Sequence, residues 1–195
     1  VVLAHPRDLD AWAGDVHSFS GIHAGVFPAW DALPTADTII DEIGGQRLRV
    51  LRQLDGDHPP KVLLATMQAL LQPVPDREQL GKQRRRLRVG QEVPLEEVVT
   101  WLVSQGFQRM EAVEIPGEFS SRGGILDVFS PDAEAPYRLE FLGDAIESIR
   151  QFSPDSQRSL GDLQAVEVTA QLRPRDGEKV VLRGNLTDYL PARSW

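Results

Sequence analysis

The sequence predicts two consecutive domains, an α/β domain with a small parallel sheet and an α+β domain with an antiparallel sheet. Before residue 81, apolar runs typical of buried strands alternate with helical runs, and this alternation indicates a parallel sheet. After that point, short strand-like runs separated by turns dominate, which is typical of an antiparallel meander. Pro73 and Pro75 separate the two patterns, so we place the boundary near Gly81, with domains over residues 1–81 and 82–171.

The first domain begins with alternating strands and helices. Three apolar runs predict buried strands, at residues 1–4, 24–27 and 62–65, and a helix over residues 67–71 follows the third run. Apolar residues also recur at steps of three and four after Pro6, which predicts an amphipathic helix whose buried face holds Leu9, Trp12, Val16 and Phe19.

A further helix is predicted over residues 46–54. Its apolar residues Leu48, Val50 and Leu51 are expected to face a core. Its arginines are expected to face water, because an unpaired charge is rarely buried; they are Arg47, Arg49 and Arg52.

The second domain is predicted to open with a strand over residues 86–89 and a helix over residues 95–105. Pro94 suits the start of that helix and Gly106 suits its end. Several antiparallel strands are expected between residues 107 and 168.

Composition excludes several classes of protein. The chain has 195 residues, no cysteine and a net charge of −8. Disulfides, thiolate zinc sites and cysteine nucleophiles are therefore excluded, and nonspecific nucleic-acid binding by the whole chain is disfavoured. No apolar run approaches the roughly 20 residues that cross a bilayer, and no secretory signal opens the sequence, so we expect a cytoplasmic protein without membrane contact.

One basic cluster stands out against this acidic background. It consists of Lys82, Arg84, Arg85, Arg86 and Arg88, which we call the basic strip. A solvated connector or a charge-protected edge strand would explain it. This explanation is preferred to a functional one, in which the strip docks within the protein or, less favoured, faces DNA; five charges alone do not decide between them.

No catalytic, metal-binding or cofactor-binding constellation emerges from the motifs. The nearest approach to a phosphate-binding loop is DREQLGKQ at residues 76–83, where aspartate replaces the first glycine and glutamine replaces the magnesium-binding hydroxyl. The sequence contains neither a GxGxxG nor a GxSxG motif, and its four histidines have no metal-ligand spacing. We therefore expect a non-enzymatic chain with no cofactor.

The most informative segment is residues 117–150, GEFSSRGGILDVFSPDAEAPYRLEFLGDAIESIR. Its apolar residues suit a half-buried meander; they are Ile125, Val128, Phe129, Leu139, Phe141, Ile146 and Ile149. Arg122 and Arg138 fall inside or beside these strands. They either pair locally with Glu118, Asp127 or Glu140 across strands, or they present a face for a protein partner.

This segment, together with the following QFSPDSQRSL, closely resembles the UvrB-like module at the N-terminus of bacterial transcription-repair coupling factors, the Mfd family, and less closely the second domain of UvrB. Upstream, the motifs FPAWDALP, QRLRVLRQL and VLLATMQALLQPVP resemble the first domain of the same family. The resemblance implies a degenerate P-loop-like first domain without a Walker A motif, followed by a domain like UvrB domain 2. It also implies that residues 172–195 begin a return to the first domain and that the chain is a fragment.

The resemblance further implies a recruitment module that binds UvrA and couples stalled RNA polymerase to nucleotide excision repair. The expected contact residues for UvrA are Arg122, Arg138, Leu142, Glu140 and Phe119. Leu142 stands where the family has an aromatic residue, a departure that reduces contact area. RNA polymerase and DNA would be reached only through the parent protein, whose ATP-driven motor lies in other domains. Those other domains are themselves expected partners, since the family covers this arginine face in an autoinhibited state.

The alternative is a DNA-binding fragment of a UvrB-like excision-repair helicase, with the basic strip on phosphate. The stretch of sequence between residues 46 and 62 is too short to contain the long DNA-clamping hairpin of UvrB. This difference favours the coupling-factor family.

Overall fold

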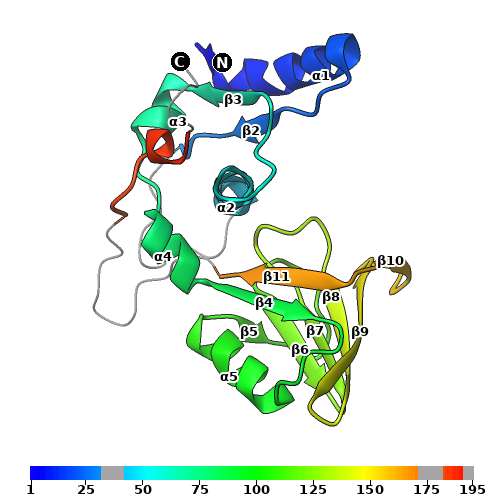
Figure 1. Ribbon diagram of the computed structural model, residues 1–195. Helices are drawn as coiled ribbons and strands as arrows, with labels where there is room; N and C mark the ends of the chain where they lie inside the picture. Colours follow the sequence, from blue (N-terminus) through cyan, green and yellow to red (C-terminus); the bar gives the residue numbers. More distant parts are fainter. Residues whose placement is uncertain (32–41, 171–181, 191–195) are drawn as a thin grey trace. The chain divides into compact units, whose positions relative to one another are not determined.

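The computed structural model describes residues 1–31, 42–170 and 182–190. The chain divides into two compact units (Figure 1). Unit 1 comprises Val1–Lys82 with Pro174–Trp195, and unit 2 comprises Gln83–Arg173. A small parallel sheet in unit 1 and antiparallel pairing in unit 2 confirm the general fold class. The P-loop-like character of the first domain and the role assigned to each domain stay predictions, and much of the expected return segment lies outside the described residues.

Unit 1 contains the predicted parallel sheet. Its strands are β1 (Val2–Leu3), β2 (Gly25–Phe27) and β3 (Leu63–Thr66), in the order β1-β3-β2. The first strand is less buried than expected, since Leu3 is buried but Val2 is 47% exposed. Its place at one end of the strand order explains this, because among the described residues β1 pairs with β3 alone.

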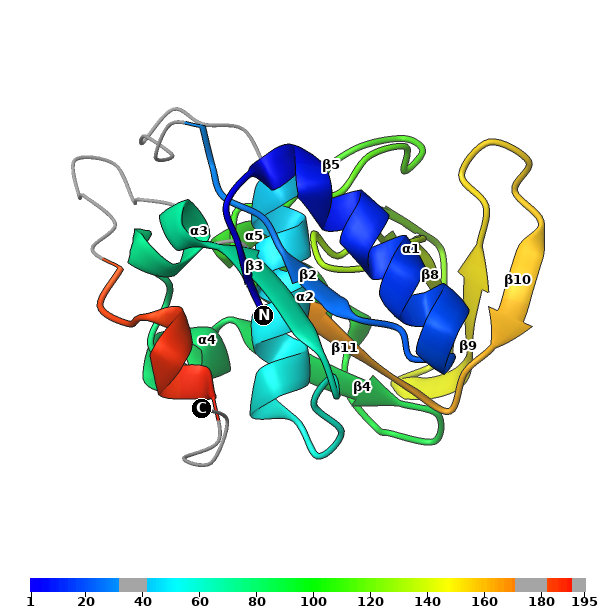
Figure 2. The ribbon, with the colours of Figure 1, turned by 90° about the horizontal axis from the view of Figure 1, so that it is seen from above.

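Two helices cover opposite faces of this sheet (Figures 1 and 2). They are α1 (Leu9–Ser20), which follows the 3₁₀ turn η1 (Pro6–Asp8), and α2 (Glu42–Asp55). Side chains of a strand alternate between faces, so within β3 Leu64 packs with Leu9 of α1 while the next residue, Ala65, packs with Leu51 of α2.

The predicted helix α1 is confirmed, but its predicted apolar face is wrong. Leu9 is buried, whereas Trp12 is 47% and Phe19 90% exposed. The strands of the sheet have only two to four residues each. A helix of twelve residues is longer than such a sheet, so its later turns extend past it.

Arg47 on α2 corrects the expectation that the arginines of this helix face water. Its guanidinium lies 4.2 Å from the ring centroid of Phe27 and 3.9 Å from that of Trp30. Nη1 donates to the Pro28 carbonyl at 2.8 Å and to Gln72 Oε1 at 3.2 Å. Only 1% of Arg47 is exposed, while Arg49 and Arg52 are half-buried. Stacking and hydrogen bonds together stabilise a buried charge.

The remaining elements of unit 1 are two short helices and a 3₁₀ turn from a later part of the chain. Helix α3 (Met67–Leu71) is capped by Thr66, whose hydroxyl accepts from the amide of Ala69, and α4 (Arg77–Lys82) ends the first stretch. From the later part of the chain, the 3₁₀ turn η2 (Leu186–Tyr189) buries both of its terminal side chains in the same core as α2. The Tyr189 hydroxyl donates to the Pro75 carbonyl at 2.8 Å.

Unit 2 is built on a six-stranded sheet in the order β10-β9-β8-β7-β6-β5. The strands are β5 (Gln108–Arg109), β6 (Glu118–Arg122), β7 (Ile125–Val128), β8 (Tyr137–Leu142), β9 (Ala145–Phe152) and β10 (Ser159–Asp162). All neighbours are antiparallel except β5 and β6, which are parallel and depart from the prediction. Figure 2 shows β9 and β10 as a hairpin at the edge of this sheet.

The remaining elements of unit 2 enclose its core. Strands β4 (Arg84–Arg88) and β11 (Ala165–Thr169) form an antiparallel pair, and α5 (Leu95–Ser104) follows Pro94 as predicted. The helix stops at Gly106, where φ is +82°. The amide of Gly106 donates to the Val103 carbonyl and that of Phe107 to the Leu102 carbonyl, the pattern of a Schellman motif. Val98, Leu102 and Phe107 then pack with the sheet.

Arg47→Ala is expected to lower the free energy of unfolding by about 3 kcal/mol. The change removes the donor to the partly buried carbonyls of Pro28 and Pro73 and opens a cavity beside two aromatic rings. Urea denaturation followed by tryptophan fluorescence measures the loss. Gln53→Ala, at an exposed position of the same helix, serves as the control and is expected to change stability by less than about 0.5 kcal/mol. Equal unfolding midpoints for the two variants would contradict a stabilising role for Arg47.

Candidate protein-binding surface

The predicted arginine site lies on one face of the sheet in unit 2. Leu126, Val128 and Leu139 point into the core. Residues alternate between faces along a strand, so the alternate positions form the opposite face, which we call the outer face. Its members on β6 to β9 are Ser120, Arg122, Ile125, Asp127, Arg138, Glu140, Leu142, Ser148, Arg150 and Phe152.

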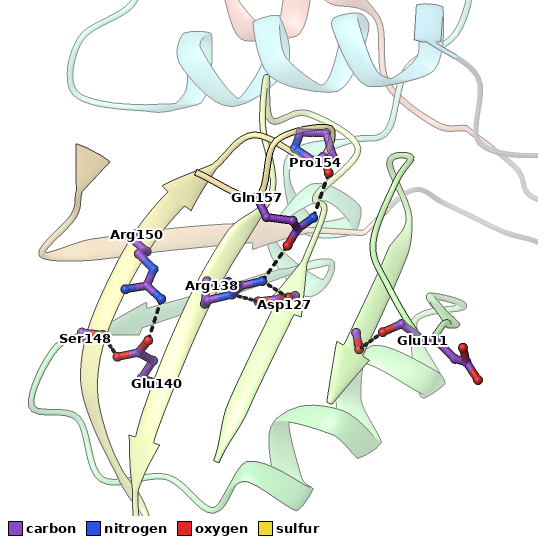
Figure 3. Close-up of polar contacts among 9 residues, drawn as sticks. Glu111, Asp127, Arg138, Glu140, Ser148, Arg150, Pro154 and Gln157 are labelled. Atoms are coloured by element: carbon purple, nitrogen blue, oxygen red, sulfur yellow. Dashed lines mark hydrogen bonds and ion pairs between the residues drawn. The ribbon is translucent and has the colours of Figure 1, made fainter. Parts of the chain in front are cut away.

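Arg138 is held by Asp127, its direct neighbour across β7 and β8 (Figure 3). Nε lies 2.6 Å from Oδ1 and Nη2 2.7 Å from Oδ2, a bidentate ion pair. The guanidinium also lies 4.5 Å from the ring centroid of Phe152. Hydrogen bonding to Asp127 raises the pKa of Arg138 above its ordinary value, against the opposing effect of burial. Since 19% of its side chain is exposed, Arg138 remains partly reachable from solvent.

Arg150 is neutralised in the same way. It is the direct cross-strand neighbour of Arg138, and like charges in such positions repel. Arg150 Nη2 lies 2.8 Å from Glu140 Oε1, while the Ser148 hydroxyl donates to the other carboxylate oxygen at 2.9 Å (Figure 3). The two arginines therefore each have a carboxylate on the outer face.

Arg122 differs from these two arginines. It is exposed at the end of β6, and within the described residues no ion pair or hydrogen bond involves its guanidinium. Its cross-strand neighbour Ile125 is 41% exposed, and Leu142 at the end of β8 is 72% exposed. We call Arg122, Ile125 and Leu142 the hairpin-end patch, because they flank the turns of the β6–β7 and β8–β9 hairpins.

The two hairpin ends are tied together at Gly124. Its carbonyl accepts from the amide of Phe141 at 2.7 Å. A Cβ on residue 124 would lie 2.7 Å from the Phe141 carbonyl oxygen, closer than real Cβ atoms approach. The turns themselves use Gly123 and Gly143, with φ of +60° and +62°, which only glycine adopts cheaply. The absence of a side chain at Gly124 therefore allows the two hairpin ends that carry the patch to lie this close together.

The expected contact residues fall into three groups. Arg122 and Leu142 lie in the exposed patch, and Arg138 and Glu140 lie half-buried in the ion-pair network. Phe119 is wrong as a surface residue, because it is opposite Val128 on the core face and 0% exposed.

Ile125, one of the apolar residues that predicted the half-buried meander, lies on the outer face. Counting alternate positions back from Val128 places Leu126 inward and Ile125 outward, so the strand period contained this information.

The basic strip is largely occupied by ion pairs. Lys82 pairs with Glu78 at 2.5 Å, Arg85 with Glu97 at 2.6 Å and Arg84 with Glu167 at 3.6 Å. Arg86 and Arg88 are exposed on β4. Three of the five cations therefore have acidic neighbours, which weakens the case for a phosphate-binding strip.

The described residues offer neither a metal centre nor a membrane segment. Among them, no cluster of three or more histidine, aspartate or glutamate side chains could hold a metal ion. No helix of the described ranges has both the length and the apolar content that crossing a bilayer requires.

Comparison with known proteins places this surface in a family. Residues 86–172 match the UvrB interaction domain. The chain is 38% identical over 172 residues to the transcription-repair-coupling factor of Mycobacterium tuberculosis, an alignment that covers 84% of this chain and 14% of that protein. It is 35% identical over 190 residues to the transcription-repair-coupling factor of Myxococcus xanthus, an alignment that covers 89% of this chain and 16% of that protein. It is 33% identical over 140 residues to the transcription-repair-coupling factor of Escherichia coli, which covers 71% of this chain and 12% of that protein.

The chain belongs to the transcription-repair-coupling factor family. The resemblance found in its motifs is thereby confirmed. The chain spans 12% to 16% of the length of these three relatives. The match to the UvrB interaction domain lies entirely within unit 2, and it contains both the outer face and the hairpin-end patch.

Asp127→Ala is expected to lower the free energy of unfolding by about 2 kcal/mol, because it leaves a mostly buried guanidinium beside a second cation. Thermal or urea denaturation measures the effect. Glu147→Ala removes an exposed carboxylate from β9 of the same sheet and is expected to cost less than about 0.5 kcal/mol. Similar losses for both variants would show that the Asp127 pair adds nothing specific.

Proposed function

We propose that unit 2 of this chain is a non-catalytic module that binds UvrA and thereby brings the longer coupling factor to nucleotide excision repair. The family match supports a protein-interaction role for the region that carries the outer face. In this proposal RNA polymerase and DNA are reached through other parts of the longer protein. The module contributes recognition only.

The observation that carries the proposal is the exposed patch at the two hairpin ends. Arg122 projects from a rigid sheet, and Ile125 and Leu142 expose apolar surface beside it. Arginine together with apolar contact area is the composition typical of binding hot spots. The Arg122 guanidinium has five N–H donors in a fixed fork that fits a carboxylate.

The partner surface follows from this chemistry. An acidic side chain of UvrA beside an apolar patch would complement Arg122 together with Ile125 and Leu142. Arg138 contributes differently, because Asp127 already occupies two of its donors. We assign the main charged contact to Arg122 and a supporting contact to Arg138.

DNA binding through the basic strip is the less favoured function. The chain as a whole is acidic, with a net charge of −8. Ion pairs to Glu78, Glu97 and Glu167 occupy three of the five cations. Affinity for phosphate depends on unneutralised cations, and Arg86 and Arg88 are the exposed arginines of the strip outside these three ion pairs.

Arg122→Ala is expected to weaken binding of the chain to UvrA by about 2 kcal/mol, or roughly 30-fold in Kd, because it removes the main charged contact. Calorimetric titration with purified UvrA measures the change. Arg88→Ala removes an exposed arginine of unit 2 from β4 and serves as the matched control, with an expected change below about threefold. Wild-type affinity for the Arg122 variant, or equal losses for both, would defeat the assignment of the patch.

Leu142→Phe is expected to strengthen UvrA binding by about threefold to tenfold. Phenylalanine offers more contact area than leucine at an exposed position whose backbone is fixed by the neighbouring turn. The same titration measures the gain, and Leu160→Phe at an exposed position of β10 is the control. An unchanged or reduced affinity for the Leu142 variant would show that the partner does not contact this side chain.

A further inference from the structure

The loop between β9 and β10 contains an unusual backbone conformation. Gln157 has φ of +58°, and it is the only residue other than glycine with positive φ in the described ranges. Its amide donates to the Ser153 carbonyl at 2.8 Å, which closes a turn over residues 153–157. L-residues adopt this region at a steric cost that glycine avoids. Such strain persists where the surroundings fix it, often at functional positions.

The side chain of Gln157 connects this loop to Arg138. Gln157 Nε2 donates to the Pro154 carbonyl at 2.8 Å, so the side-chain amide has a fixed orientation. Its Oε1 accepts from Arg138 Nη2 at 3.0 Å (Figure 3). Glycine at this position would relieve the strain but would lose both hydrogen bonds. Gln157 therefore supplies a side-chain hydrogen bond to Arg138 that the turn itself does not require.

Three contacts together fix the orientation of the Arg138 guanidinium. Asp127 accepts from Nε and Nη2, Gln157 accepts from Nη2, and the ring of Phe152 lies against the group. Within the described residues Nη1 donates no hydrogen bond. The two N–H groups on Nη1 are thus the donors that a partner can use.

We propose that Gln157 is a positioning residue for UvrA binding, which holds Arg138 so that Nη1 faces the partner. This inference rests on the proposed function. It extends the binding surface from the sheet to the β9–β10 loop. Gln157 acts through Arg138, and its own side chain is not assigned a contact with the partner.

Gln157→Gly tests the proposal, because it removes the side chain and relieves the backbone strain at once. Stability, measured by thermal denaturation, is expected to stay the same or rise. Affinity for purified UvrA is expected to fall about fivefold to tenfold. Ser156→Gly adds the same backbone freedom at the neighbouring residue and leaves Gln157 in place, so it is expected to bind like the wild type.

A double-mutant cycle separates positioning from direct contact. In an Arg138→Ala background, Gln157→Gly is expected to have no further effect on UvrA affinity. A further loss in that background would overturn the positioning role, as would wild-type affinity for Gln157→Gly alone. Failure of the proposed function is distinct, since in that case neither the wild-type chain nor the Arg122→Ala variant binds UvrA.

Discussion

The bidentate contact between Arg138 and Asp127 is the interaction on which the outer face of unit 2 depends. It allows two arginines to lie directly opposite each other in neighbouring strands, because Asp127 on β7 pairs with Arg138 from the side away from Arg150, while Glu140 pairs with Arg150. Without these carboxylates the sheet would bring two cations together in a half-buried setting. Arg122 lies beyond this network, at the end of its strand, and this position leaves its charge available to a partner.

Arginine has structural roles in both units of the chain. In unit 1 Arg47 lies between Phe27 and Trp30, and in unit 2 Arg138 lies against Phe152. In each case a planar cation contacts an aromatic ring and donates to fixed oxygen acceptors, a combination that lysine does not reproduce. The position of an arginine within a strand or helix therefore says little about its role. The neighbouring acceptors and rings decide it.

Local patterns predicted most elements, including the parallel sheet, the helix between Pro94 and Gly106 and the meander. One error arose where residue type was preferred to spacing, whereas the exposed Trp12 and Phe19 of α1 show that spacing alone also fails when a helix is longer than its sheet. Arg47 shares a helical face with Val50, Leu51 and Leu54 by the period of three and four residues, yet its charge suggested exposure. The choice of Asp127 among three candidate partners for Arg138 depends on the register between β7 and β8, which two distant segments set together. The contact of Gln157 with Arg138 similarly depends on the turn over residues 153–157, whose conformation no local sequence motif predicts.

The close approach at Gly124 has a consequence for how this surface can diverge among related proteins. The side chain at position 142 points into solvent and can change without disturbing the backbone, so contact area can be tuned there by single substitutions. Position 124 offers no such freedom, because any side chain would push the neighbouring hairpin away and separate the cation from its apolar neighbours. Selection for a different partner can therefore alter the chemistry of the patch far more readily than its geometry.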